Sequence, residues 1–109
     1  MRLLFVEDDF FQVTAYQDRL EWYEAEGVFI DNVAAAIAAL ASRAFDYIIL
    51  DHRIGGGTGE DVHKYILHNH IPTPVIAASS MMEGEYPGAV RLQKTEVFTF
   101  LESKLKRKE

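Results

Sequence analysis

Acidic side chains follow two short apolar segments, and they are the residues best suited to chemistry. Glu7 and Asp8 come directly after the apolar residues 3–6, and Asp51 comes directly after the mostly apolar residues 45–50. Carboxylates brought close together repel one another, which raises their pKa values unless a cation joins them. Oxygen ligands suit Mg²⁺, which usually keeps several waters and takes a phosphate oxygen. The pattern therefore predicts a Mg²⁺ (or Mn²⁺) site that handles phosphate.

Strand and helix patterns alternate along the chain and would bring these carboxylates together. Apolar runs predict strands at residues 2–6, 28–30, 45–50, 75–78 and, more weakly, 89–93. Helical spacing predicts helices at residues 9–26, from 33 to about 41, from 58 or 59 to about 68, and in a closing segment with Val97, Phe98, Leu101 and Leu105. Gly27 is expected to stop the first helix, and Asn32 to cap the second. This alternation is typical of an α/β fold, a doubly wound five-stranded parallel sheet.

Length and composition narrow the class of protein. The chain has 109 residues, enough for one core, so we expect a single domain over residues 1–109. A net charge of −6 argues against nonspecific nucleic-acid binding, and the lack of cysteine excludes disulfides and thiolate chemistry. The N-terminal apolar stretch is too short for a signal peptide, and no apolar run reaches the length of a transmembrane helix. We therefore expect a cytoplasmic protein with no nucleic-acid or membrane partner.

Nearly the whole chain resembles the receiver domain of bacterial response regulators, which is flavodoxin-like in fold. Glu7 and Asp8 after the first strand match the family's acidic pair, and Asp51 at the end of the third strand matches its phosphoacceptor aspartate. Four elements occur in the family's order, each at the end of a strand, and a loop glycine lies eight residues after Asp51. The matching residues are Glu7, Asp8, Asp51, Gly59, Ser79 and Lys94.

The resemblance implies a role for each of these positions. Asp8, Asp51 and the backbone carbonyl of Arg53 would hold Mg²⁺, with Glu7 acting through water. Asp51 would accept a phosphoryl group from a histidine kinase or phosphotransfer protein. Two further residues would contact the phosphoryl oxygens, namely Ser79 and Lys94. The plainer alternative is an ordinary ion pair between Asp51 and Lys94, with the acidic pair capping the next helix.

The chain departs from the family's pattern near its C-terminal end. Thr95 follows Lys94, where the family usually has a proline, so the usual cis peptide is not expected. Residues 80–88 contain two glycines and a proline and are too short for the family's fourth helix. Arg91 stands where many receivers have a switch aromatic, and Tyr86 lies in the loop. We expect the fourth helix to be missing or replaced by a loop.

A narrower resemblance offers a different function. Residues 50–52 and 58–62 are similar to a receiver-derived group proposed to process cyclic phosphates, although Arg53 stands where that group has an aspartate. His52 would then be an acid or base in metal-dependent hydrolysis. Otherwise His52 is a loop histidine packed beside the sheet. The remaining histidines are expected to be solvated residues on or after a helix, namely His63, His68 and His70.

The sequence thus favours a stand-alone receiver that accepts phosphate on Asp51 and acts through a protein partner, rather than a turnover enzyme. The alternatives are a metal-dependent cyclic-phosphate phosphoesterase and a receiver-fold interaction module that is never phosphorylated. The first helix region has more aromatic rings than one helical stripe can bury, which leaves core packing and a partner surface both open. These rings belong to Phe10, Phe11, Tyr16, Trp22 and Tyr23.

Overall fold

Apolar segments form the central sheet of the protein, as the computed structural model describes it over residues 1–109. Its five strands run parallel in the order β2-β1-β3-β6-β7. Strands β1 and β3 lie side by side and are almost fully buried, which explains why their sequences lack polar alternation. The strands are β1 (Arg2–Val6), β2 (Glu26–Ile30), β3 (Tyr47–Leu50), β6 (Val75–Ala78) and β7 (Val90–Leu92).

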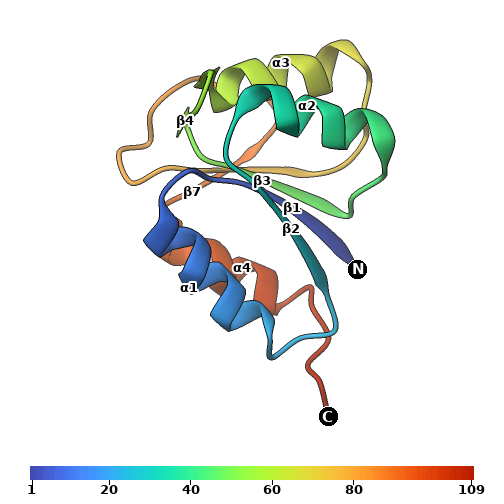
Figure 1. Ribbon diagram of the computed structural model, residues 1–109. Helices are drawn as coiled ribbons and strands as arrows, with labels where there is room; N and C mark the ends of the chain where they lie inside the picture. Colours follow the sequence, from blue (N-terminus) through green and yellow to red (C-terminus); the bar gives the residue numbers. More distant parts are fainter.

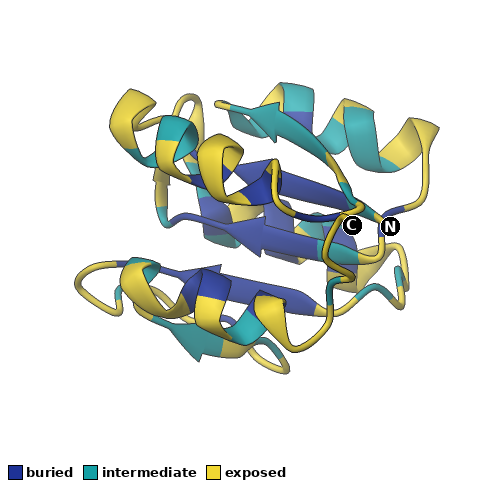
Figure 2. Ribbon diagram, turned by 90° about the horizontal axis from the view of Figure 1, so that it is seen from below, coloured by how far each residue is buried: buried dark blue, intermediate teal, exposed yellow.

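Helices cover both faces of this sheet. One face carries α1 (Phe10–Leu20) and α4 (Val97–Glu102), and the other carries α2 (Val33–Ser42) and α3 (Gly59–His68) (Figure 1). A separate apolar cluster fills the space on each side of the sheet. The three central strands β1, β3 and β6 are buried between the helices, the edge strands β2 and β7 are partly exposed, and the outer surfaces of the helices are exposed (Figure 2). The predicted doubly wound α/β fold is therefore confirmed.

Side-chain caps determine where the helices begin. The Asp9 carboxylate accepts a hydrogen bond from the backbone N–H of Phe11 at 2.9 Å, which makes Asp9 the N-cap of α1. The Asn32 side chain accepts a bond from the N–H of Ala35 at 2.8 Å, so the predicted cap of α2 is confirmed. At the start of α3, the Asp61 carboxylate accepts a bond from the backbone N–H of Thr58 at 2.9 Å.

The first helix is shorter than its sequence pattern predicts. It ends at Leu20 instead of residue 26, and Gly27 lies inside β2 instead of stopping the helix. Pairing with β1 outweighs helical periodicity here, since Gly27 stands opposite Leu3 in the parallel ladder. A Cβ atom at position 27 would come within 2.6 Å of the Leu20 side chain. The glycine therefore lets the end of α1 pack closely against the edge strand.

Two short elements were missed by the sequence pattern. A two-stranded hairpin follows β3, formed by β4 (Arg53–Ile54) and β5 (Gly57–Thr58). Its turn needs a left-handed backbone at Gly56, whose φ is +78°. The closing helix is divided into a 3₁₀ turn, η1 (Lys94–Glu96), and the short α4. The chain has no cis peptide bond, so the Lys94–Thr95 bond is trans.

Between β6 and β7 the chain has no helix, as predicted. Residues 79–89 form turns and extended backbone that cross directly from one strand to the next. Gly84 and Gly88 adopt positive φ values of +77° and +84°, which a helix cannot accommodate. The four α-helices of the chain thus correspond to a doubly wound fold in which a loop replaces the fourth helix.

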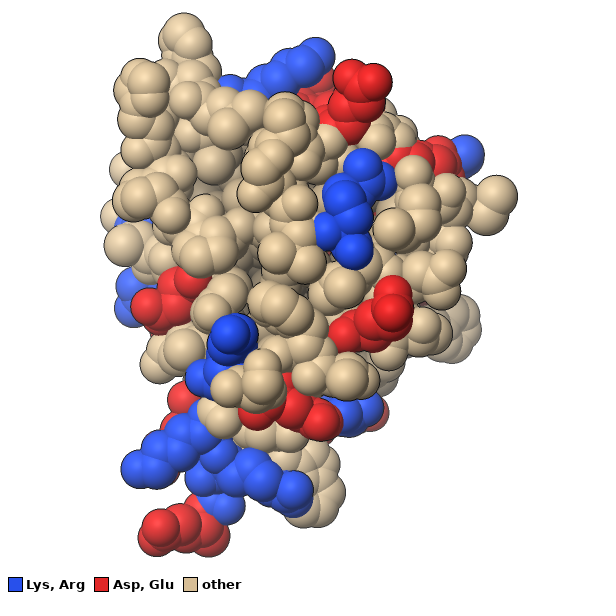
Figure 3. All heavy atoms as spheres, turned by 180° about the vertical axis from the view of Figure 1, so that it is seen from behind, with Lys and Arg blue, Asp and Glu red and all other residues tan.

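Charged side chains are unevenly placed on the surface. On the face opposite to that of Figure 1, basic side chains gather at the end of the molecule that carries the C-terminus (Figure 3). Elsewhere on that face, basic and acidic side chains are scattered among uncharged ones (Figure 3). None of the helices is long and apolar enough to cross a membrane.

His63 is buried, which contradicts the expectation of a solvated helix-face residue. Its side chain is 3% exposed, and its ring centre lies 5.5 Å from that of Tyr86. The inner face of α3 also buries Val62 and Ile66. Because the loop that replaces the fourth helix brings Tyr86 over α3, the buried face of this helix is wider than its apolar stripe.

Acidification is expected to destabilise the fold through His63. Burial lowers the pKa of His63 below its ordinary value of 6.5. Between the two pKa values, the unfolded chain therefore binds a proton at His63 more readily than the folded protein does. This contribution to stability is therefore complete above about pH 6.5 and is lost as the pH falls toward the lower folded pKa. Denaturant unfolding at several pH values should show a smaller acid loss for His63→Gln than for the wild type. His68→Gln, at an exposed position, is the control, and equal losses in all three proteins would contradict the prediction.

Candidate functional site

Three carboxylates meet at the ends of β1 and β3. These strands are neighbours and pair Val6 with Leu50, so the residues that follow them emerge together. Glu7, Asp8 and Asp51 each place one oxygen within 4.8 Å of the other two. Glu7 and Asp51 are buried, with 3% and 7% of their surface exposed, and Asp8 is exposed. The predicted acidic residues therefore do converge at the C-terminal edge of the sheet, where α/β folds place ligands.

Lys94 links two of these acids. Its ammonium nitrogen lies 3.0 Å from Glu7 Oε1 and 3.2 Å from Asp51 Oδ2. Burial acts to lower the pKa of Lys94, but the bonds to Glu7 and Asp51 outweigh burial and raise it. Lys94 reaches the acids from η1, directly after the last strand. One cation therefore balances part of the negative charge that the sheet edge concentrates.

One lysine does not fully compensate the buried acids. Burial of Glu7, together with the nearby Asp51 carboxylate, raises the pKa of Glu7 to about 7. The protonated form of Glu7 is therefore favoured more than in an isolated carboxyl group while no further cation is bound. A divalent cation at this edge would favour the ionised carboxylates.

The donor atoms fit a hard divalent cation. The group contains three carboxylates and no histidine or cysteine, which is the ligand chemistry of Mg²⁺ or Mn²⁺. Capping does not account for the acidic pair, because Asp9 caps α1 and Glu7 instead accepts a bond from the Asp9 N–H at 3.2 Å. The exposed Asp8 carboxylate forms no ion pair within the chain. It remains open to a ligand from solution.

A cavity of about 300 Å³ opens above Asp51. Ser79, at the end of β6, is buried on its wall, and its hydroxyl oxygen accepts bonds from the N–H groups of Met81 at 3.3 Å and Glu83 at 3.4 Å. Because these bonds use its oxygen as acceptor, the hydroxyl proton is free to be donated into the cavity. The lining residues are Asp8, Asp9, Asp51, Arg53, Ser79, Ser80, Met81, Glu83 and Lys94.

Arg53 lies at the edge of this cavity, and its side chain turns to the loop. The guanidinium group makes a two-point contact with the Glu83 carboxylate, at 3.1 and 3.2 Å from Nε and 3.0 Å from a terminal nitrogen. The ion pair connects the hairpin that follows β3 with the loop that follows β6. That the Arg53 carbonyl binds a metal stays a prediction.

His52 packs against Tyr86, a contact that the sequence pattern did not indicate, and its Nε2 atom lies 3.9 Å from the Glu83 carboxylate. Its Nδ1 atom lies 2.9 Å from the Tyr86 hydroxyl, and its side chain is largely buried. His52 is not among the residues that line the cavity above Asp51. A Cβ atom at Gly84 would come within 2.6 Å of the His52 ring, so glycine is needed for this packing. His52 is thus a packed loop residue, as the simpler interpretation held.

Tyr86 anchors the loop that replaces the fourth helix. It is buried against the cluster between the sheet and α3, and burial raises the pKa of its hydroxyl. The Arg91 guanidinium lies 5.1 Å from the centre of the Tyr86 ring and donates hydrogen bonds to the backbone carbonyls of Glu83 and Gly84. A large aromatic residue two positions after Gly84 and directly before Pro87 was the only sequence signal of this role.

Comparisons with known proteins point to one family. The sequence model of the response regulator receiver domain matches residues 3–109. No curated protein matches the chain at a significant level.

Solved structures share the fold over nearly the whole chain. A signal receiver domain of a putative LuxO repressor from Vibrio parahaemolyticus is 24% identical, with a TM-score of 0.79, over 94% of this chain and 87% of that one. The non-phosphorylated HemR receiver domain from Leptospira biflexa is 23% identical, with a TM-score of 0.80, over 99% and 98%. The receiver domain of a sensor histidine kinase from Pseudomonas aeruginosa, with magnesium coordinated in its active-site cleft, is 18% identical, with a TM-score of 0.78, over 94% of each chain.

Proposed function

This chain belongs to the response regulator receiver domains of two-component signalling, and from that membership we propose that it accepts a phosphoryl group on Asp51 in a Mg²⁺-dependent reaction. One observation carries the proposal. The buried Asp51 carboxylate lies 3.2 Å from the Lys94 ammonium and faces a cavity of about 300 Å³ that Asp8 and Ser79 also line. The nucleophile Asp51, the cation Lys94 and the hydroxyl donor Ser79 thus border one cavity.

The chain's own residues supply the attack and the positioning. An Asp51 oxygen forms a bond to phosphorus while the bond from phosphorus to the donor breaks, and the donor's leaving group keeps the electron pair. Lys94 is close enough to contact a phosphoryl oxygen attached to Asp51, and the Ser79 hydroxyl donates to another. Neither group needs a large movement, because both already border the cavity.

The acidic residues would hold the metal. Asp8, Asp51 and the Arg53 carbonyl would be direct ligands, and Glu7 would act through water. When bound, Mg²⁺ would neutralise charge on these carboxylates and on the incoming phosphoryl group. The raised pKa of Glu7 and the free Asp8 carboxylate support this assignment.

In this proposal, one protein transfers the phosphoryl group to Asp51, and a second protein binds the receiver and receives the signal. The donor is a histidine kinase or phosphotransfer protein, and residues 1–109 act as one receiver domain. Because a loop replaces the fourth helix, the output surface differs from one built on that helix. No observation favours cyclic-phosphate hydrolysis, since the hydroxyl of Tyr86 occupies Nδ1 of His52 and His52 lies outside the cavity.

Intact-mass measurement tests the proposal against hydrolysis. The protein is incubated with Mg²⁺ and a small phosphodonor such as acetyl phosphate, and separately with nucleoside cyclic phosphates. We expect the mass of one phosphoryl group to be added and no cyclic phosphate to be consumed. Turnover of a cyclic phosphate that is lost in His52→Ala, without any gain in mass, would assign the enzyme function instead.

A further inference from the structure

Tyr16 lies in the apolar core between the sheet and the helices α1 and α4, and it is only 3% exposed. Its ring centre lies 4.9 Å from that of Phe5 and 5.9 Å from that of Phe98. Despite this burial, the Tyr16 hydroxyl has no hydrogen-bond partner within the protein. Because an unpaired buried hydroxyl is costly, we expect it to have a role in another state of the molecule.

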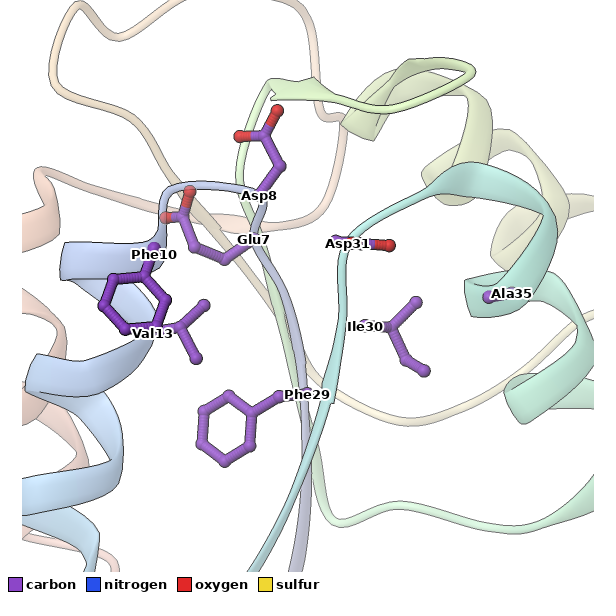
Figure 4. Close-up of a pocket in the computed structure, with 8 residues that line it drawn as sticks. All are labelled: Glu7, Asp8, Phe10, Val13, Phe29, Ile30, Asp31 and Ala35. Atoms are coloured by element: carbon purple, nitrogen blue, oxygen red, sulfur yellow. The ribbon is translucent and has the colours of Figure 1, made fainter.

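The Glu7 carboxylate lies on the same side of the sheet as Tyr16. The N–H of Glu7 bonds to the Ile30 carbonyl at 2.9 Å, so Glu7 continues β1 in extended backbone. Side chains two residues apart on a strand share a face, which places Glu7 on the face of Phe5, and its side chain turns toward α1 (Figure 4). Helical side chains lean toward the N-terminal end of their helix, which for α1 is the end beside Glu7. The hydroxyl of Tyr16 is therefore directed toward the acidic residues.

The charges of the site act on this hydroxyl. Burial, followed by the charges of Glu7 and Asp51, raises the pKa of Tyr16. The hydroxyl therefore keeps its proton at neutral pH. A protonated hydroxyl without a partner is a hydrogen-bond donor that a nearby carboxylate can use.

Lys94 is the cation that pairs with Glu7 in the unmodified protein. Its ammonium nitrogen lies 3.0 and 3.3 Å from the two carboxylate oxygens of Glu7 and 3.2 Å from Asp51 Oδ2. Lys94 and Asp51 border the cavity of about 300 Å³, whereas Glu7 does not. A phosphoryl group on Asp51 brings more negative charge into that cavity than the carboxylate has, so it draws Lys94 away from Glu7.

Glu7 then needs another donor. At 3% exposure it cannot be solvated by bulk water, and it keeps only the bond from the Asp9 N–H at 3.2 Å. A buried carboxylate that loses its cation is costly unless a hydrogen bond replaces the contact. A second cavity, of about 430 Å³, borders Glu7 together with Phe10 and Val13 of α1, so the carboxylate has room to turn toward the helix. Val13 precedes Tyr16 by one helical turn on the same face.

We propose that Tyr16 is a positioning residue, whose hydroxyl donates a hydrogen bond to the Glu7 carboxylate when Lys94 turns to a phosphoryl group on Asp51. The inference rests on the proposed function and adds a residue of α1 to it. The new bond holds Glu7 in place while Lys94 contacts the phosphoryl oxygen. The hydroxyl thus favours the phosphorylated state over the unmodified one, in which it is unpaired.

Tyr16→Phe tests this exchange, because it removes the hydroxyl and keeps the ring that packs against Phe5 and Phe98. The probe is beryllium fluoride with Mg²⁺, a phosphoryl mimic that bonds to a carboxylate oxygen, and NMR titration measures its affinity. The variant should bind beryllium fluoride about tenfold more weakly than the wild type, since a hydrogen bond to a charged group is lost only in the loaded state. Its affinity for Mg²⁺ alone, and its resistance to denaturant without ligand, should equal those of the wild type.

Tyr23→Phe is the matched control. Tyr23 is a buried tyrosine of the same apolar cluster, and neither of the two cavities beside the acidic residues includes it. Its variant should bind beryllium fluoride as the wild type does. Equal weakening in Tyr16→Phe and Tyr23→Phe would assign the effect to core packing and overturn the proposal.

The tyrosine signal gives a readout that packing alone would not move. In protein labelled with ¹³C at tyrosine Cζ, the Tyr16 signal is assigned by its absence in Tyr16→Phe. It should shift when beryllium fluoride is added to the protein in Mg²⁺, and little when Mg²⁺ alone is added. An unmoved signal, or equal affinity of wild type and Tyr16→Phe for beryllium fluoride, would overturn this inference alone. A wild type that neither binds beryllium fluoride nor gains mass from acetyl phosphate would overturn the proposed function with it.

Discussion

Asp51→Asn is expected to abolish the gain of one phosphoryl mass that the wild type shows with acetyl phosphate and Mg²⁺. The amide has the shape of the carboxylate but lacks an oxygen nucleophilic enough to attack phosphorus. Lys94 also contacts Glu7, at 3.0 Å in the wild type, so we expect the cationic wall of the cavity to be retained in this variant. The loss should therefore be complete, and intact-mass spectrometry measures it directly.

Asp46→Asn is the matched control for this result. Asp46 lies just before β3, on the exposed side, where its carboxylate accepts a bond from the Arg2 N–H at 2.7 Å. It is an aspartate of the same segment that faces away from the cavity, so its variant should gain the same mass as the wild type. Circular dichroism would verify that both variants are folded. A full mass gain in Asp51→Asn would show that another residue accepts the group.

The meeting of the carboxylates could be predicted because it depends only on strand ends. Once β1 and β3 are neighbours in a parallel sheet, Glu7, Asp8 and Asp51 must emerge at one edge. The cap at Asn32 was predictable for a similar reason, since it is a local interaction between residues close in sequence. Periodicity and capping depend on residues that are close in the sequence, so both can be predicted from a single sequence.

Interactions between distant segments could not be predicted in this way. His52 and Tyr86 are 34 residues apart, and their contact depends on how the loop after β6 folds back. The burial of His63 follows from the same loop, because Tyr86 covers it from outside the helix. The early end of α1 depends on the pairing of Gly27 with β1. In each case the deciding contact is tertiary, and no periodicity within the segment records it.

Asp8→Asn is expected to weaken Mg²⁺ binding by at least about tenfold, equal to about 1.4 kcal/mol of binding free energy. Asp8 is the exposed member of the acidic group and has no cationic partner, so its full charge is available to a metal. Asparagine keeps a carbonyl oxygen but removes that charge, on which affinity for a hard divalent cation depends. NMR titration of the wild type with MgCl₂ should shift the amides at the ends of β1 and β3. In Asp8→Asn these shifts should need much higher concentrations.

Asp9→Asn separates this effect from a general loss of acidity. Asp9 is adjacent, lines the same cavity and carries the same charge, but its carboxylate is used to cap α1 through the N–H of Phe11. Because asparagine caps a helix about as well as aspartate, the variant should stay folded and bind Mg²⁺ nearly as the wild type does. Equal weakening in Asp8→Asn and Asp9→Asn would mean that the edge attracts Mg²⁺ only through its total charge. Selective loss at Asp8 would identify a defined ligand position, which the in-line attack of Asp51 on phosphorus requires.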